Sequence, residues 1–326
     1  MDVVLYPMKL KAFLRETLWG GKRLKEEYGK SSDLPNVAES WELSCHPDGL
    51  SVIANGPAAG MTLADWIAKN GAEEVMGIRA ARFPQFPLLI KLIDSARDLS
   101  VQVHPDSRYN WRMEHESGKT EMWYIVDCEL GASLLYGFNR EVTHDEVRQR
   151  VKDRTLLEVC CRVPVHKGDI FFIPAGTLHA IGKGIVLCEI QQSSNTTYRL
   201  YDYGRLDPKT GKQRELHVEE ALNVLHCGPI DEPHTPEAIL DICDGVELYL
   251  LRACPFFTAY DVKLNGTSRF RVSNGSFQSF TVLSGSLQVS ANGVDVTFEK
   301  GETAYLPAGL GPYEVSGRAE YVLSEV

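Results

Sequence analysis

Four side chains of the kinds that bind divalent metals lie in the central part of the chain. Gln102 and His104 are two residues apart in the alternating stretch 99–104, so both side chains leave the same face of an expected strand. Glu121 begins a later apolar run, and His179 follows a Pro-Ala-Gly turn. Two imidazoles, a carboxylate and a carboxamide can surround a divalent metal and still leave a position for water or substrate.

Each histidine taken alone has a simpler interpretation. His104 precedes Pro105 and Asp106, a common turn setting, and an isolated His179 would be an ordinary core or surface residue. The spacing Gly168-x5-Pro174-x4-His179 favours the metal site, because a turn, a buried strand and a second turn place the histidine at a fixed point. The joint pattern therefore predicts a metal centre.

These motifs resemble those of a known family. Gly168-x5-Pro174-x4-His179 is similar to the second metal-binding motif of the cupin superfamily, and Gln102-x-His104 followed by Glu121 is similar to the first. The stretches 99–106, 119–123 and 197–205, with Leu18-Trp19-Gly20-Gly21 and Glu39-Ser40-Trp41, resemble class I mannose-6-phosphate isomerases, above all their shorter bacterial branch. The resemblance covers roughly residues 10–325.

The resemblance implies a zinc-dependent enzyme, with one zinc ion per chain, that interconverts mannose 6-phosphate and fructose 6-phosphate. It assigns the zinc ligands to Gln102, His104, Glu121 and His179. It places Trp19, Ser100, Lys119 and Arg205 in the sugar-phosphate pocket, and Arg199, Glu189 and Lys119 in the catalytic machinery, with Glu189 as the general base. Lys183 stands where the wider superfamily has asparagine, at a position that is not a ligand.

The chemistry of such an isomerase fits these residue types. Moving a carbonyl between C1 and C2 requires removal of a weakly acidic proton, so a Lewis-acid metal that stabilises the enediolate contributes several kcal/mol. A base such as Glu189 would carry the proton between the carbons, although a partner of a metal ligand or a salt bridge is an equally open role for it. Arg199 would bind phosphate bidentately or stabilise the oxyanion.

The pattern of apolar residues predicts the elements that position these groups. Short apolar or alternating runs predict strands at 88–93, 99–104, 122–126, 170–173 and 185–190. Helical periodicity predicts helices at 63–78, 143–154 and 218–225. A Pro-rich linker at 229–233 precedes a series of short strands, so a mainly β fold is expected.

An internal repeat divides the chain. Residues 168–176 recur 133 positions later as 301–309, and 124–126 can be aligned with 281–283 at an offset of 157. With the resemblance, this predicts two cupin (jelly-roll) β-barrel domains with helical insertions in the N-terminal half. Residues 1–232 would form the catalytic domain, and residues 233–326 a degenerate copy without metal ligands, since His179 aligns with Pro312 and Glu121 with about Gln278.

The composition limits the partners. With 34 basic and 44 acidic residues among 326, the net charge of −10 argues against nucleic acid and leaves a small anion held by local Lys or Arg. No apolar run approaches the ~20 residues of a membrane span, and segment 1–7 lacks the pattern of a signal peptide. Eight cysteines without a CxxC pair favour buried thiols in a cytoplasmic protein. The oligomeric state, monomer or homodimer, stays open.

Two other functions compete with the isomerase. Two histidines and a carboxylate also suit an iron(II) oxygenase, but such an enzyme has no need of Lys119 and Arg199 beside the metal. A non-catalytic cupin that binds sugar phosphates is the second alternative, and it gives little reason for a complete ligand set.

Overall fold

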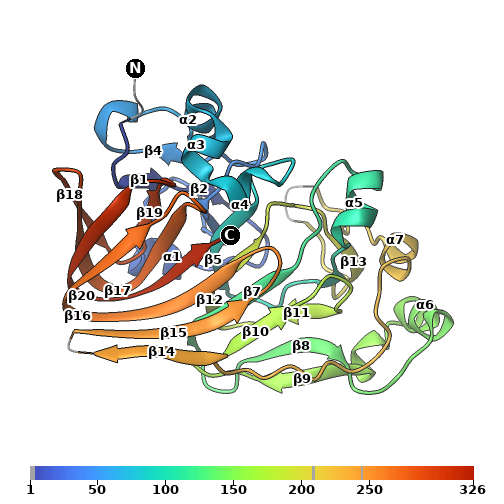
Figure 1. The fold of residues 1–326 in the computed structure, drawn as a ribbon. Coiled ribbons are helices and arrows are strands. Elements are labelled where there is room, and N and C mark those ends of the chain that lie inside the picture. Colours follow the sequence, from blue (N-terminus) through green and yellow to red (C-terminus); the bar gives the residue numbers. More distant parts are fainter. Residues whose placement is uncertain (1–3, 208–209, 244) are drawn as a thin grey trace.

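The computed structural model of the chain describes residues 4–207, 210–243 and 245–326 (Figure 1). Residues 1–3, part of the segment considered above as a signal peptide, lie outside the described residues, as do the side chains of residues 242 and 243. Within the described part, twenty strands form sheets of nine, six and five strands, and the helices are short. The expectation of a mainly β fold is confirmed.

The first β unit consists of the six-stranded and five-stranded sheets, which face each other without closing into a continuous barrel. Ile93 and Ile125 of one sheet and Leu134 and Ile181 of the other share one buried cluster, so the core lies between the sheets. The six-stranded sheet runs in the order β10 (Ile170–Ile173), β7 (Glu121–Cys128), β12 (Ile185–Gln192), β5 (Leu88–Ser95), β3 (Glu39–Leu43) and β2 (Phe13–Arg15). The five-stranded sheet runs β13 (Tyr198–Tyr201), β6 (Val101–Val103), β11 (His179–Ile181), β8 (Ser133–Phe138) and β9 (Cys160–Pro164).

The second β unit is the nine-stranded sheet (Figure 1). Its three longest strands, β16, β20 and β17, are neighbours in the sheet. Its strands are β14 (Ala238–Cys243), β15 (Val246–Ala253), β16 (Thr258–Val272), β20 (Gly311–Glu325), β17 (Gln278–Ala291), β19 (Thr303–Leu306), β1 (Met8–Lys11) and β4 (Val52–Ile53), with β18 (Val294–Glu299) paired to β17. Since β1 and β4 come from the N-terminal end of the chain, this sheet draws on both halves of the sequence. The boundary at residue 232 stays a prediction.

The repeat is visible in the strand ladders. The order β10-β7-β12-β5-β3-β2 recurs as β19-β17-β20-β16-β15-β14. Glu121 pairs with Ile173, and Gln278, 157 positions after Glu121, pairs with Leu306, 133 positions after Ile173. Even the irregularities agree, since the ladder between β7 and β12 skips Val126 and the ladder between β17 and β20 skips Leu283. The offsets of 157 and 133 that the sequence alignment gave therefore relate paired residues of the first unit to paired residues of the second.

One detail of the repeat needs correction. The offset between β12 and β20 is 134 rather than 133, because Gln191 pairs with Glu121 as Glu325 pairs with Gln278. Tyr313 is buried and donates from its hydroxyl to Oε1 of Gln278 at 2.8 Å, whereas Pro312 is exposed. The counterpart of His179 in the second unit is therefore Tyr313, and the alignment with Pro312 was wrong by one residue. The second copy has one extra residue after its Pro-Ala-Gly turn at 307–309.

The helices are shorter than the sequence predicted. The expected helix 63–78 is three pieces, because Gly71 and Gly77 take positive φ values of 90° and 89° that interrupt an α-helix. The helix at 143–154 is confirmed, with Thr143 capping its first turn and Arg154 closing it in the left-handed conformation. The helices are α1 (Arg23–Glu27), α2 (Leu63–Asn70), α3 (Ala72–Met76), α4 (Ile78–Ala81), α5 (Ser107–Met113), α6 (His144–Asp153) and α7 (Val218–Leu222).

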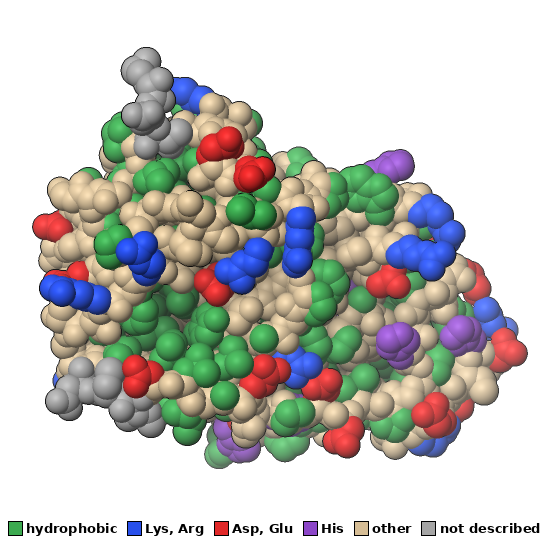
Figure 2. Space-filling view, viewed as in Figure 1, with side chains coloured by type: hydrophobic (Ala, Val, Ile, Leu, Met, Phe, Trp, Pro, Cys, Tyr) green, Lys and Arg blue, Asp and Glu red, His purple; other side chains and the backbone are tan. Residues whose placement is uncertain are grey.

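The surface mixes charges of both signs. On the face shown in Figure 2, acidic and basic side chains alternate, and hydrophobic side chains gather over β14 to β16. Ile239 and Leu240 on β14 are among the exposed large apolar residues. Among the described residues, no helix has the length and apolar character needed to span a bilayer.

Candidate metal centre

A row of side chains on the five-stranded sheet brings three predicted site residues together. Gln102 of β6 lies opposite His179 of β11 on one side and opposite Arg199 of β13 on the other. Directly paired residues of an antiparallel sheet project from the same face, so these three side chains form one line. Ser100, two residues before Gln102, donates to its Oε1 at 3.2 Å, as the alternation predicted.

The facing sheet supplies the carboxylates. Glu121 and Trp123 leave the same face of β7, and across the sheet Trp123 lies opposite Glu189, which lies opposite Lys91. The indole N–H of Trp123 donates to Oε2 of Glu121 at 2.8 Å and to Oε2 of Glu189 at 2.9 Å. Trp123 therefore orients a predicted metal ligand and the predicted base at once.

Three unprotonated ligand atoms converge between the sheets. Nδ1 of His104 lies 2.9 Å from the carbonyl oxygen of Thr196, and Nδ1 of His179 lies 2.9 Å from that of Thr177. A carbonyl only accepts, so both Nδ1 atoms carry the proton and both Nε2 atoms present lone pairs. Those lone pairs lie 2.8 Å and 4.0 Å from Oε1 of Glu121, an oxygen that lacks a hydrogen-bond partner. The three side chains are buried and form the one His, Cys, Asp or Glu cluster within metal-binding distance in the described residues.

The electrostatics keep these groups in their ligand forms. Burial lowers the pKa of His104 well below its usual range and also lowers that of His179, so both are neutral. Burial raises the pKa of Glu121, but the positive charge of Lys119, together with that of Lys91, outweighs this effect and lowers the pKa of Glu121 to about 2. Two neutral imidazoles and a carboxylate that point at one another are a ligand set that suits a divalent cation.

Gln102 and Lys119 complete the surroundings of this cluster. The amide nitrogen of Gln102 lies 3.4 Å from Nε2 of His179, and rotation of the amide by 180° brings its oxygen to that place. Nζ of Lys119 lies 3.2 Å from both Nε2 of His104 and Oε1 of Glu121. The four predicted ligands thus lie together, and their assignment as ligands stays a prediction.

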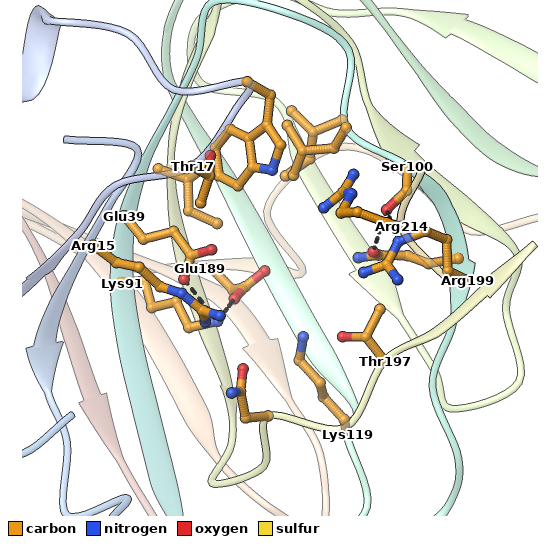
Figure 3. A pocket seen from close by; sticks show the side chains of 16 residues that line it. Arg15, Thr17, Glu39, Lys91, Ser100, Lys119, Glu189, Thr197, Arg199 and Arg214 are labelled. Carbon is orange, nitrogen blue, oxygen red and sulfur yellow. Dashed lines mark hydrogen bonds and ion pairs between the residues drawn. The ribbon is translucent and has the colours of Figure 1, made fainter. Parts of the chain in front are cut away.

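A cavity of about 270 Å³ opens beside the cluster. Figure 3 shows Arg199, Arg214 and Ser100 on one side, Arg15, Lys91, Glu39 and Glu189 on the other, and Lys119 and Thr197 between them. The lining includes six predicted site residues, which are Trp19, Ser100, Gln102, Lys119, Glu189 and Arg199. It also includes residues that sequence reasoning missed, namely Arg15, Thr17, Glu39, Lys91, Asn195, Thr197 and Arg214.

One wall of the cavity holds two adjacent guanidinium groups. Burial, followed by the charge of Arg214, lowers the pKa of Arg199 to about 10. Nε of Arg199 donates to Ser100 at 3.3 Å. Arg214 is held by the carboxylate of Asp202 through two bonds of 2.6 and 2.8 Å. An anion between these two groups would relieve their mutual repulsion.

Arg205 lies apart from this wall. Its guanidinium binds the carboxylate of Asp202 and the carbonyl of Asp98, and it lies over the ring of Tyr203. It is absent from the lining of the cavity, where Arg214, bound to the same Asp202, is present. A substrate role for Arg205 stays a prediction. Its contact with Asp202 helps to hold the carboxylate that binds Arg214.

The opposite wall holds a buried ion pair. Nζ of Lys91 lies 3.0 Å from Oε1 of Glu189 and 3.9 Å from Oε2 of Glu39. Burial opposes the charge on Lys91, but Glu189 and Glu39 outweigh it and raise its pKa, so Lys91 is protonated. The sequence carried a usable signal, because a lysine inside the apolar run 88–93 needs a buried partner. Glu189 makes the salt bridge considered above, and its role as base is untested.

The chain is similar in sequence and structure to known proteins. Residues 8–134 match the catalytic domain of type I phosphomannose isomerase, and residues 247–326 match the cupin domain of mannose-6-phosphate isomerase. The probable mannose-6-phosphate isomerase GmuF of Bacillus subtilis is 38% identical over 98% of this chain and 99% of its own. The chain belongs to the type I mannose-6-phosphate isomerase family.

Other relatives agree with this family. The mannose-6-phosphate isomerase of Streptococcus mutans is 35% identical, with 98% of both chains covered. A crystal structure of mannose 6-phosphate isomerase from Bacillus subtilis superposes with a TM-score of 0.90 at 32% identity, covering 98% of this chain and 99% of that one. The resemblance given by the sequence motifs and the cupin fold class are thereby confirmed, and the metal cluster lies in a type I mannose-6-phosphate isomerase fold.

Proposed function

We propose that the chain is a metal-dependent aldose–ketose isomerase that interconverts mannose 6-phosphate and fructose 6-phosphate in the cavity between the two sheets. The single observation that carries the proposal is the convergence of His104, Glu121 and His179 on one point beside a cavity with two guanidinium groups on its wall. Family membership favours this activity over an iron(II) oxygenase or a non-catalytic binding protein.

The substrate orientation follows from the charges. Phosphate would lie against Arg199 and Arg214, within reach of Ser100 and Thr197, because paired guanidinium groups bind a dianion through several charge-assisted hydrogen bonds. The sugar carbon chain would then extend past Lys119 toward the cluster. Trp19 would cover the sugar, since it lies buried in the cavity wall.

The metal would be held by Gln102, His104, Glu121 and His179, and we infer that it is zinc. Imidazole and carboxylate ligands suit zinc, and a bound zinc ion supplies Lewis-acid polarisation of the substrate oxygens. The chain itself would do the rest: Lys119 donates hydrogen bonds toward the sugar oxygens, and the sheets exclude water.

Glu189 is the proposed proton carrier. It lies in the cavity wall, with Oε2 held by Trp123 and Oε1 beside the protonated Lys91. As a carboxylate, Glu189 would accept a proton from the carbon next to the carbonyl. Transfer of that proton to the neighbouring carbon, together with transfer of the hydroxyl proton from the oxygen on C2 to the oxygen on C1, completes the conversion of the aldose to the ketose.

We also infer a cytoplasmic location, without a nucleic-acid or membrane partner. The seven cysteines whose side chains the structure describes are free thiols, which supports a reducing compartment.

A coupled assay tests the proposed activity. The protein is supplied with mannose 6-phosphate, and fructose 6-phosphate formation is followed with and without a chelator. Turnover in the metal-loaded protein that stops after complete metal removal and returns with zinc is the expected result. Turnover that persists without metal, or its absence in fully loaded protein, contradicts the proposal.

A further inference from the structure

A polar network outside the cavity holds the loop that contacts His104. The 193–197 loop follows β12, and its Thr196 carbonyl is the acceptor for Nδ1 of His104. Glu116, in the connection between α5 and β7, accepts three hydrogen bonds from this loop on Oε2. The donors are Ser194 Oγ at 2.9 Å, the Asn195 backbone N–H at 3.1 Å and Thr196 Oγ1 at 3.1 Å.

The other oxygen of Glu116 connects the loop to a third part of the chain. Nε2 of His46 lies 3.2 Å from Oε1 of Glu116, and Nδ1 of His46 accepts the backbone N–H of Asp48 at 3.1 Å. Since Nδ1 accepts, the proton is on Nε2, which donates to Glu116. Asp48 also accepts from the side chain of Asn195 at 2.7 Å, so the loop is held from two sides.

Burial and charge show that the network is constrained. Ser194 is fully buried, His46 is 4% exposed, and buried Asn110 donates to both Ser194 Oγ and Thr196 Oγ1. The hydrogen bond from His46, with those from Ser194 and Asn195, lowers the pKa of Glu116 to about 2 against the effect of burial. Glu116 is therefore an anion at any pH at which the protein works.

The position of the 193–197 loop affects the metal centre through one carbonyl group, that of Thr196. If the loop moved, the Thr196 carbonyl would leave Nδ1 of His104, and the imidazole would lose the contact that keeps its proton on Nδ1. The other tautomer carries a proton on Nε2, the atom that faces Glu121, and cannot bind a metal there. The geometry of the loop and the ligand state of His104 are thus linked.

We propose that Glu116 is the positioning residue of the metal centre: by anchoring the 193–197 loop it fixes the orientation and tautomer of His104. The inference rests on the metal site of the proposed function. It adds a residue that contacts neither the metal ligands nor the cavity, and it assigns to the His46–Glu116 pair a role in metal affinity.

The test compares Glu116→Ala with a matched control, Glu146→Ala. Glu146 is also a carboxylate that accepts several hydrogen bonds, from Arg140 and Arg150, but it lies on α6 away from the site. Zinc affinity is measured by competition with a chelator, and the tautomer of His104 by long-range ¹H–¹⁵N NMR of the metal-free protein. Glu116→Ala should weaken zinc binding about 10- to 100-fold and lower the population of the Nδ1–H tautomer, and Glu146→Ala should change neither.

Several outcomes separate the possibilities. A variant that only unfolds at lower temperature, with zinc affinity within about twofold of the wild type and an unchanged tautomer, overturns the inference. If Glu116→Ala does not fold, Glu116→Gln, which keeps the shape and loses the charge, carries the same comparison with the same criteria. Failure of the proposed function looks different, because the wild type itself would then bind no metal or leave mannose 6-phosphate unchanged.

Discussion

The two β units have the same pattern of strand pairing, but they carry different side chains between their strands at the position of the metal cluster. In the first, His179 lies beside Gln102 and points its lone pair toward Glu121. In the second, Tyr313 occupies the matching place, stacks on Phe270 at 5.7 Å and donates to Gln278.

The contrast shows that the scaffold does not depend on the ligands. Gln278 donates in turn to Glu325 at 3.1 Å, so the side chains at this place in the second unit bind one another. The first unit instead brings two imidazole nitrogens and a carboxylate oxygen together, a set that suits a divalent cation. Strand register is set by backbone pairing and alternation, which both units keep, and function depends on a handful of side chains.

The largest effect is expected when a predicted metal ligand of the first unit is removed. His179→Ala should lose bound metal and reduce isomerase turnover by about a thousandfold or more, because several kcal/mol of transition-state stabilisation depend on the metal. Metal analysis and the coupled assay measure both. Tyr313→Phe, the matched change in the second unit, should leave metal content and turnover unchanged, and a normal metal content in His179→Ala would move the site elsewhere.

The buried ion pair is the next point of contrast. Lys91 and Glu189 lie opposite each other, and the matching pair in the second unit is Tyr260 and Leu323. Lys91→Met should lower the free energy of unfolding by about 3–5 kcal/mol, since it leaves Glu189 buried without its partner. Denaturant unfolding measures this.

The double variant Lys91→Met with Glu189→Leu sharpens the same comparison. It should recover most of the lost stability while remaining inactive, because the second unit accommodates an uncharged pair at this place in the ladder. Equal stability of the single and double variants would show that the charge of Glu189 is tolerated alone.

The guanidinium pair should affect binding of the substrate rather than of the metal. Arg214→Ala is expected to raise KM for mannose 6-phosphate about 10- to 100-fold, the worth of a hydrogen bond between charged groups, with zinc content unchanged. Arg269→Ala, a surface arginine of the second unit paired to Glu314, is the control. An unchanged KM would place the phosphate elsewhere in the cavity.

The smallest effect concerns a carboxyl group of the second unit. Asp261 is 4% exposed, and burial, followed by the charge of Glu320, raises its pKa to about 7; Lys263 and Lys167 offset this and Glu247 adds to it. Because the folded state binds this proton more tightly than the unfolded state, stability should fall as the pH rises from about 4 to about 7.

Asp261→Asn removes this dependence. The variant should match the wild type near pH 4 and be more stable by about 1 kcal/mol near pH 8, a value below the linkage limit because buried charges relax and recruit water. Thermal unfolding at the two pH values checks the sign. A variant that is less stable at pH 8 would mean that ionised Asp261 is stabilised by Lys263, which lies 3.8 Å away.

The sequence predicted the strands and the ligand set because both leave local patterns. Alternation around Gln102 and the spacing before His179 are properties of single strands and turns, and the repeat predicted that one β unit occurs twice. Arg214 left no such pattern, since it follows an irregular segment and reaches the cavity through its bond to Asp202. The helix at 63–78 was overextended because its apolar periodicity continues across Gly71, where the backbone turns.

The pairing of Met8 with Tyr305 has a consequence for the order of events during synthesis. Strand β1 can pair with β4 soon after both are made, but this pair joins the rest of the sheet only through β19, which is made much later. Contacts between such distant residues slow folding, because a very long loop must close before they form. Completion of the C-terminal sheet is therefore expected to be a late step of folding, although β1 is made at the very start.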